Sequence, residues 1–285
     1  FDVKTSKTRQ ITYSVIDGSD NPTGKSETYS IPSTNTTSRW VMKNVPAIRE
    51  EKFTTSIDNH ISKMEFQMSA QQFPNSPRKD IMGTWNTVAQ ALLKDEDFGE
   101  KLERDNAWLN DDVKIIKAST GNKLDEAKKI YAFVKNNIKC NGGHGIYLSA
   151  PMKDIFKNKS GSVADVNLLL TAMLKHENIQ ASPVILSTRS NGVTHEFYPL
   201  VNRFNYVICK AEIDGISYFL DASKPYFGFN KLPEYCLNGQ ARTIDQNTSP
   251  VYFYPDSVKE AKMTNVMLFN DEKAAGKWNG MLTSS

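Results

Sequence analysis

The first 80 residues carry short segments in which apolar and polar residues alternate. These segments are Ile11–Val15, Thr28–Ile31, Arg39–Met42 and His60–Met68. A period of two residues is typical of a strand with one buried face. The same stretch is rich in Ser, Thr, Asn and Pro. We therefore predict a β-rich N-terminal domain over residues 1–80, which we expect to be only part of a larger β-rich unit.

Between Met82 and Ile138 the apolar residues recur at three- and four-residue steps, beginning with Trp85, Val88 and Leu92. This spacing places them on one face of a helix. A second such run covers 124–134, with acidic residues in its first turn and lysines near its end, which complement the helix dipole. The pattern predicts two or three amphipathic helices.

The stretch 160–174 is apolar around most of a helix circumference. A Gly-Ser turn precedes Val166, Leu169, Leu170 and Met173, which form a continuous apolar stripe at helical spacing. An amphipathic surface helix has a narrower stripe. We predict a helix that is buried on most of its sides.

Three β-prone runs follow this helix, at Ser182–Ser187, Tyr206–Ile213 and Ser217–Leu220. Asp-Gly at 214–215 joins the last two and is a strong hairpin signal. Helices followed by antiparallel strands predict an α+β core, which we place at residues 81–247. Strand-like segments at 251–254 and 265–269 predict a short C-terminal β extension over 248–285, interpreted as the start of a further domain.

Composition excludes several classes of protein. The 285 residues include 35 basic and 32 acidic side chains, so a net charge of +3 creates no basic field and we expect no nucleic-acid partner. No apolar run approaches the ~20 residues of a membrane-spanning helix, so we expect no transmembrane segment. The chain opens at Phe1 with neither Met nor an apolar signal region, and we interpret it as a processed or excised piece.

The three cysteines, Cys140, Cys209 and Cys236, are far apart and include no CxxC pair. They therefore suggest neither a disulfide framework nor a zinc site. We expect no metal and no cofactor. Small buried hydrophobic positions are the simplest interpretation of these residues.

Several motifs resemble the transglutaminase core. Gly161–Asp165, the leucine-rich 168–174 and Ile179–Val184 are similar to G-x-C-x-D, a helix and a GI-x-A-x-PV strand. Downstream, Phe204–Val207 resembles F-N-H-V and Tyr218–Ser223 resembles Y-x-L-D-A-T. The resemblance covers roughly residues 85–245. It implies a papain/transglutaminase-like core, with helices packed on an antiparallel sheet.

Two further segments resemble one subfamily. Trp40–Phe53 is similar to the closing part of a β-rich domain of unknown function that precedes this core in many Bacteroidetes envelope proteins, and Leu232–Gln240 also fits. The resemblance implies a periplasmic or cell-envelope location.

The resemblance also implies that the catalytic triad is degenerate. The Cys position falls on Val163, the His position on Tyr206, and the Asp position on Asp221. Valine has no nucleophile, and a tyrosine with an ordinary pKa of about 10 is not a base at neutral pH. Because triad members act as a unit, this loss removes covalent catalysis.

The resulting hypothesis is a catalytically inactive transglutaminase-like domain that acts as a binding or scaffolding module of the bacterial cell envelope. A peptide, protein or glycan ligand would occupy the former active-site groove. We expect that groove to be lined by Ser162, Val163, His195, Tyr206 and Asp221. A domain that only spaces or presents other domains is a further alternative.

An alternative is a cysteine-dependent hydrolase or acyltransferase with a relocated nucleophile, Cys140, paired with His144 in a Gly-rich loop. Ser162 is a weaker nucleophile candidate, since a one-residue shift at a helix start rotates a side chain by about 100°; a helix cap is the simpler role. We also predict that Cys209 faces the core and that Tyr206 and Asp221 share a phenol–carboxylate hydrogen bond.

Overall fold

The computed structural model describes most of the chain, in eleven stretches: 2–16, 22–38, 41–49, 51, 54–63, 65–73, 75–104, 106–117, 121–258, 263–270 and 276–284. The chain divides into two compact units, Phe1–Arg49 and Glu50–Ser285. The domain limits predicted at 80/81 and 247/248 remain predictions.

In the first unit, β1 (Asp2–Ile16) and β2 (Pro22–Ser38) form a long antiparallel hairpin, with Asp2 opposite Ser38 and a register shift between Ser14 and Ile16. The β-branched residues Thr and Ile occur in both strands and favour extended backbone. The strands predicted at 11–15 and 28–31 are therefore confirmed.

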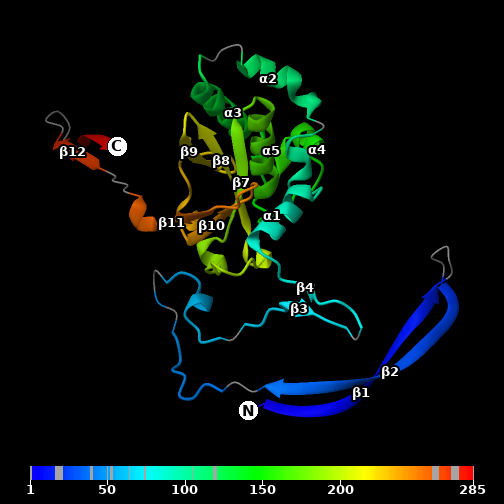
Figure 1. Ribbon diagram of the computed structural model, residues 1–285. Helices are drawn as coiled ribbons and strands as arrows, with labels where there is room; N and C mark the ends of the chain where they lie inside the picture. The colour runs from blue at the N-terminus through cyan, green and yellow to red at the C-terminus, as the bar shows by residue number, and fades with distance from the viewer. Residues whose placement is uncertain are drawn as a thin grey trace. The chain divides into compact units, whose positions relative to one another are not determined.

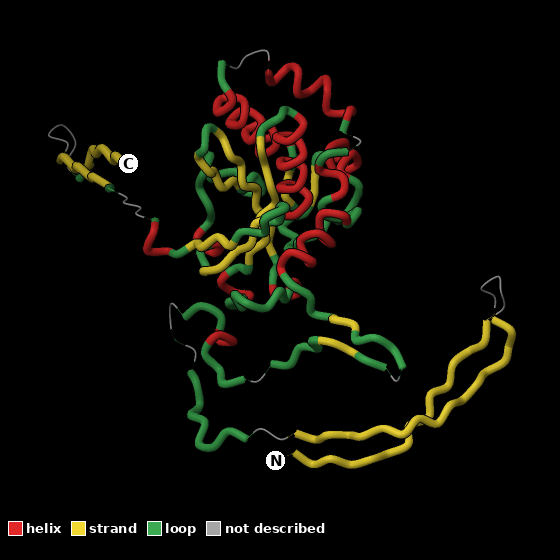
Figure 2. Tube along the Cα trace, in the orientation of Figure 1, coloured by secondary structure: helices red, strands yellow, loops and turns green. Residues whose placement is uncertain are grey.

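The segment between this hairpin and the first α-helix is mostly irregular in the residues that the structure describes, as Figure 2 shows. It contains a single 3₁₀ turn (Ile57–Asn59) and a two-residue strand pair, β3 (Ala70–Gln71) with β4 (Lys79–Asp80). The strand predicted at His60–Met68 is wrong for its described residues. Phe66 and Met68 are exposed and the segment pairs with no strand there, because alternation alone supplies no partner for the backbone.

Part of another predicted strand, Arg39–Met42, cannot be compared. Residues 39 and 40 lie outside the described residues, and 41–42 are irregular.

A five-stranded antiparallel sheet forms the centre of the second unit, in the order β11-β10-β7-β8-β9. Its strands are β7 (Gln180–Leu186), β8 (Tyr206–Ile213), β9 (Ile216–Leu220), β10 (Gly239–Thr243) and β11 (Pro250–Phe253). Asp214 and Gly215 both have positive φ, 52° and 77°, as a tight type I′ hairpin requires. The predicted β8–β9 hairpin is confirmed. β11, predicted within the C-terminal extension, forms an edge of this sheet.

Helices pack on one face of the sheet (Figure 1). They are α1 (Trp85–Lys94), α2 (Asn110–Lys117), α3 (Lys123–Asn137), α4 (Met152–Asn158) and α5 (Val163–His176). Short 3₁₀ turns lie at Glu100–Leu102, Ala107–Leu109, Arg189–Asn191, Val201–Arg203, Glu234–Cys236 and Pro255–Ser257. The α+β class, with helices packed on an antiparallel sheet, is confirmed.

The sheet separates two apolar clusters, and most of the buried helix α5 belongs to the larger one. Twelve successive residues, Val163–Leu174, are buried, as the wide apolar stripe predicted. Along β8, Val207 and Cys209 join the larger cluster under the helices, whereas Tyr206 and Ile208 join a smaller cluster that also contains Val163. This alternation follows from the two-residue period of a strand.

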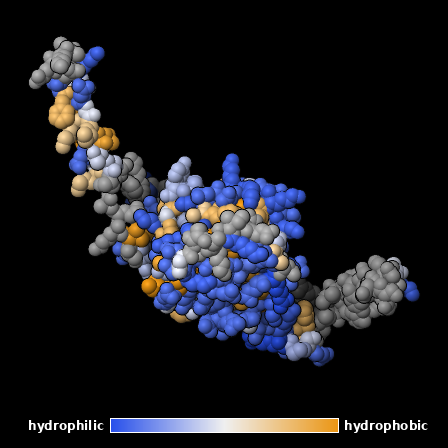
Figure 3. Space-filling view, turned by 90° about the horizontal axis from the view of Figure 1, so that it is seen from above, coloured by the Kyte–Doolittle hydropathy of each residue, from blue (hydrophilic) through white to orange (hydrophobic). Residues whose placement is uncertain are grey.

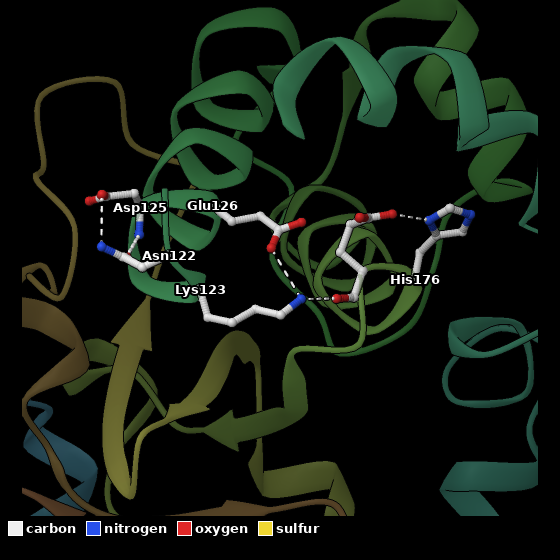
Figure 4. Close-up of polar contacts among 6 residues, drawn as sticks. Asn122, Lys123, Asp125, Glu126 and His176 are labelled. Carbon is white, nitrogen blue, oxygen red and sulfur yellow. Dashed lines mark hydrogen bonds and ion pairs between the residues drawn. The ribbon is translucent and has the colours of Figure 1, made fainter. Parts of the chain in front are cut away.

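A polar cluster joins the start of α3 to the end of α5 (Figure 4). Lys123 Nζ donates to Glu126 Oε2 at 3.1 Å and to the Glu177 carbonyl at 2.6 Å, and His176 Nδ1 lies 2.9 Å from Glu177 Oε1. Lys123 thus satisfies a carbonyl at the C-terminus of α5, where helical partners are absent. It also neutralises the buried carboxylate of Glu126, whose Oε1 has no hydrogen-bond partner among the described residues.

The C-terminal β element predicted from the sequence is present as a hairpin, β12 (Thr264–Asn270) paired with β13 (Trp278–Ser284). Its large apolar side chains, including Leu268, Phe269 and Leu282, are exposed and give this hairpin its hydrophobic colouring in Figure 3. None of the helices that the structure describes combines the length and apolar character needed to cross a bilayer.

The polar cluster leads to a stability prediction. Lys123→Met should lower the free energy of unfolding by about 0.5–1.5 kcal/mol, because it removes a half-exposed cation that donates to the Glu126 carboxylate and the Glu177 carbonyl. Adding Glu126→Gln should recover part of the loss, because it removes the uncompensated charge. Urea denaturation measures both. Lys128→Met, at an exposed position of the same helix, is the matched control; equal effects at 123 and 128 would contradict the interpretation.

Candidate functional site

The N-terminus of α5 is closed by a reciprocal cap. Ser162 Oγ accepts from the Asp165 N–H at 3.2 Å, and Asp165 Oδ2 accepts from the Ser162 N–H at 2.7 Å. Ser149 also donates to Asp165, through its N–H at 2.7 Å and its hydroxyl at 2.5 Å. The predicted capping role of Ser162 is confirmed, and its hydroxyl is engaged in holding the helix start.

Val163 is the first residue of the helix and has no exposed surface. Its N–H donates to the Gly143 carbonyl at 3.0 Å, and its side chain belongs to the smaller apolar cluster, together with Tyr206. A helix N-terminus favours an anionic nucleophile such as a thiolate. Here the side chain at that point has neither a nucleophile nor a hydrogen-bonding group.

Tyr206 is the first residue of β8, opposite Leu186 of β7, and is fully buried. Its hydroxyl donates to Asp221 Oδ2 at 2.8 Å, and it lies 3.0 Å from both Ser223 Oγ and Tyr235 Oη. The predicted phenol–carboxylate hydrogen bond is confirmed.

Asp221 follows directly after β9 and is also fully buried. Its Oδ1 accepts from Asn167 Nδ2 and from the Ser223 N–H, each at 2.9 Å. Asn167, from the middle of α5, further donates to the Val207 carbonyl and accepts from the Ala222 N–H, again at 2.9 Å. A single buried network thus joins α5, β8 and the end of β9.

Burial raises the pKa of Tyr206 far above its usual value, and the neighbouring Asp221 carboxylate raises it further. Burial raises the pKa of Tyr235 in the same way. The charged phenolate is disfavoured because it would lose its hydration and face a carboxylate. Tyr206 is therefore a neutral hydrogen-bond donor at physiological pH, and it cannot serve as a general base.

The loop 140–145 lies against the start of α5 and the start of β8. The two-residue strand β5 (Lys139–Cys140) pairs in parallel with β6 (Ser160–Gly161), and the Gly145 N–H donates to the Asn205 carbonyl at 2.8 Å. The His144 ring meets the Tyr206 ring edge-on, with centroids 5.4 Å apart. This loop places Cys140 and His144 beside the buried network.

Cys140 and His144 are nevertheless engaged with other groups. Cys140 is partly buried, and its Sγ accepts from the Gly142 N–H at 3.4 Å. In the described part of the chain no hydrogen bond joins Cys140 to His144, which contacts Tyr206 instead. A nucleophile and its base need mutual hydrogen-bond reach, and that contact is missing here.

The other cysteines are core residues. Cys209 is fully buried on the helix-facing side of β8, as predicted, and burial raises its pKa to about 12. Cys236 is buried in the smaller cluster, and burial raises its pKa as well. Within the described residues, no group of three or more His, Cys, Asp and Glu side chains is arranged to hold a metal ion.

His195 lies apart from the other four predicted groove residues. Its ring centroid is 4.5 Å from that of Tyr198 and 6.1 Å from that of Phe197, both in its own loop. His195 lines a cavity of about 560 Å³ that Ser162, Val163, Tyr206 and Asp221 do not line. The structure thus brings Val163, Tyr206 and Asp221 together, with Ser162 next to them. His195 lines a cavity to which these four residues do not contribute. The groove predicted for these five residues remains a prediction.

Three members of the network were missed by the sequence analysis: Asn167, Ser223 and Tyr235. Asn167 is a polar residue inside the apolar helix, four positions after Val163 and therefore on the same face. A buried amide in such a stripe needs a partner, which is the signal that could have identified it. Tyr235 carries no comparable signal, because its contact with Tyr206 joins segments 29 residues apart. Ser223 lies in the same turn as Asp221, whose carboxylate accepts from its N–H.

Comparisons with known proteins give structural similarity only. No protein-family model and no curated protein matches the chain. A candidate protease from Parabacteroides distasonis has a similar structure with a TM-score of 0.47 and 11% identity, covering 97% of this chain and 49% of that one. A candidate cysteine protease from Cytophaga hutchinsonii has a TM-score of 0.33 and 10% identity, covering 100% and 76%. The chain spans about half the length of the Parabacteroides protein.

The buried network predicts a pH-dependent effect of Tyr206→Phe. At neutral pH the substitution should lower the free energy of unfolding by about 1–3 kcal/mol, because Asp221 Oδ2 loses its donor. Above pH 10 an unfolded tyrosine loses its proton while folded Tyr206 keeps it, so the wild-type protein loses stability as pH rises. The variant lacks this contribution, and the difference between the two proteins should shrink above pH 10.

Urea denaturation between pH 7 and pH 11 measures this effect. Tyr226→Phe is the matched control, since Tyr226 is 97% exposed and should behave as wild type throughout. A difference between wild type and Tyr206→Phe that is constant or grows above pH 10 would contradict the assignment.

Proposed function

We propose that the chain is a catalytically inactive transglutaminase-like domain that acts as a binding or scaffolding module. One observation carries the proposal: the position at the N-terminus of α5, where this superfamily places its nucleophile, holds the fully buried Val163. The positions aligned from the motifs, 163, 206 and 221, meet at one end of the sheet, which supports the alignment.

The chemistry of the site supports inactivity. Covalent catalysis needs a nucleophile, a base to activate it and a group that orients the base. Val163 supplies no lone pair, and Tyr206 keeps its proton and donates a hydrogen bond to Asp221. Asp221 in turn accepts from Asn167 and the Ser223 N–H, so its oxygens serve the packing of buried strands.

The proposed location is the periplasm or cell envelope. It rests on the resemblance of segment 40–53 to a domain found in Bacteroidetes envelope proteins. Trp40, Glu50, Lys52 and Phe53 of this segment lie outside the described residues. The proposed partners are a peptide, a protein or a glycan.

A second candidate function is a cysteine-dependent hydrolase or acyltransferase using Cys140 with His144. The observation in its favour is position, since both residues flank the network at the α5 N-terminus and Cys140 is partly buried rather than fully enclosed. For this function, the His144 ring would have to rotate away from Tyr206 and towards the Cys140 thiol.

The first prediction from this proposal concerns turnover. Incubation with a glutamine-containing protein and a fluorescent amine should give neither amine incorporation nor ammonia release, because the site has no activated nucleophile. Mass spectrometry of the glutamine substrate and a coupled ammonia assay check both reactions. Turnover abolished by Cys140→Ser but retained in Cys209→Ser would overturn the proposal in favour of the relocated nucleophile.

The second prediction concerns thiol reactivity. With excess iodoacetamide at pH 7.5, Cys140 should be alkylated before Cys209 and Cys236, because only Cys140 is incompletely buried. Its rate should not exceed that of free glutathione, since its Sγ has no basic partner among the described residues. Peptide mass spectrometry over time gives the three rates. A Cys140 rate at least tenfold above glutathione, lost in His144→Ala, would support the second function.

A further inference from the structure

The cavity beside His195 has the size and lining of a small-ligand site. Its volume is about 560 Å³, within the roughly 300–1,000 Å³ typical of such sites. The extended segment 65–69 forms one wall and the 195–203 loop forms the other. Met82 and Leu200 supply an apolar part of the lining. Nothing in the degenerate triad contributes to this cavity.

Aromatic rings are exposed at and beside this cavity. Phe66 is 71% exposed and Tyr198 47% exposed, and both line it; Phe197, next to Tyr198 in the chain, is 79% exposed. His195 packs against Tyr198. Large aromatic surfaces left in water are unfavourable for a monomer, and a group of them marks an interaction site.

The loop that carries Phe197 and Tyr198 is anchored to the core. The Glu196 carbonyl accepts from Trp85 Nε1 at 3.1 Å and from Arg242 Nη2 at 3.3 Å, and the Arg242 guanidinium lies 4.4 Å from the centre of the Trp85 ring. The Gly192 carbonyl accepts from Ser187 Oγ at 2.6 Å and Asn238 Nδ2 at 2.9 Å. The aromatic side chains therefore project from a fixed backbone, which lowers the entropy cost of binding.

The polar lining points to an uncharged, hydroxyl-rich ligand. Gln67, Ser69 and Asn202 each carry groups that donate and accept hydrogen bonds. The two charged residues of the lining, Glu65 and Arg203, form an ion pair with each other, so neither charge demands a counter-ion from the ligand. An anionic ligand or an acidic peptide would need an unpaired cation, and this lining offers none in the described residues.

We propose that this cavity binds a saccharide. A sugar ring has an apolar C–H face that can stack on Phe66 or Tyr198, and its hydroxyls both donate and accept, as do the side chains of Gln67, Ser69 and Asn202. The inference rests on the binding role proposed above and specifies its site and ligand class. It places the site of recognition at the cavity lined by His195 and not at positions 163, 206 and 221.

Isothermal titration calorimetry of the full chain tests the proposal, with chitotetraose, cellotetraose, xylotetraose and maltotetraose as separate ligands. At least one of these saccharides should bind saturably.

Tyr198→Ala and Phe66→Ala should each weaken that association about tenfold, as truncation of an aromatic anchor does. Tyr226→Ala removes a comparably exposed aromatic outside the cavity and should bind as wild type. Asn202→Ala, at an exposed position of the lining, should also weaken binding, and it serves as the test variant if either aromatic variant fails to fold.

Absence of saturable binding to all four saccharides would overturn the proposal, as would binding that none of the cavity substitutions changes. Saturable binding of a proline-rich peptide, lost in Tyr198→Ala, with no saccharide bound, would also overturn it and assign the cavity to peptides. These outcomes are separate from turnover. Amine incorporation by a protein that binds saccharide here would contradict only the proposed inactivity.

Discussion

The hydrogen bond from Tyr206 to the Asp221 carboxylate is the interaction on which this end of the fold depends. It links the first residue of β8 to the residue that follows β9, both without exposed surface. A buried carboxylate is costly unless its oxygens are satisfied, and Asp221 reaches that state only with Asn167, the Ser223 N–H and Tyr206 together. The helix, the hairpin and the turn after it must therefore be in place at once.

This constraint explains how packing and hydrogen bonds alone hold the residues around Asp221 in place. The Asp221 carboxylate needs a hydrogen-bond donor on the Oδ2 side, and an apolar residue at position 206 would leave that oxygen without one. Tyrosine fills the volume under the loop 140–145 and supplies the missing donor, with His144 packed on its ring. Val163 completes the apolar side of the same cluster. Packing and hydrogen bonding can thus be satisfied without a nucleophile, since a fold and the chemistry placed on it are separable.

Much of the second unit could be predicted from the sequence, because its signals are long and periodic. The bounds of β8, Tyr206–Ile213, agree with the prediction, and α5 is buried along Val163–Leu174 as its stripe indicated. Alternation alone was not a sufficient signal: at His60–Met68 it could not indicate that, among the described residues, no strand pairs with this segment. Likewise, the Tyr206–Asp221 bond followed from two aligned motifs, whereas Tyr235 joined the network through a contact that no local pattern records.

His195 shows why loop residues are the hardest to place. The motifs put its loop at the border of the cleft, but the direction of the loop is decided by Glu196, whose carbonyl is held by Trp85 from α1 and by Arg242 from β10. These partners are more than 40 residues away in either direction, so spacing along the chain carries no trace of them. The same anchors hold Phe197 and Tyr198 exposed on a rigid backbone. Contacts with the core thus fix the backbone that holds these aromatic rings in water, and a ligand that covers them would pay little entropy to order that backbone.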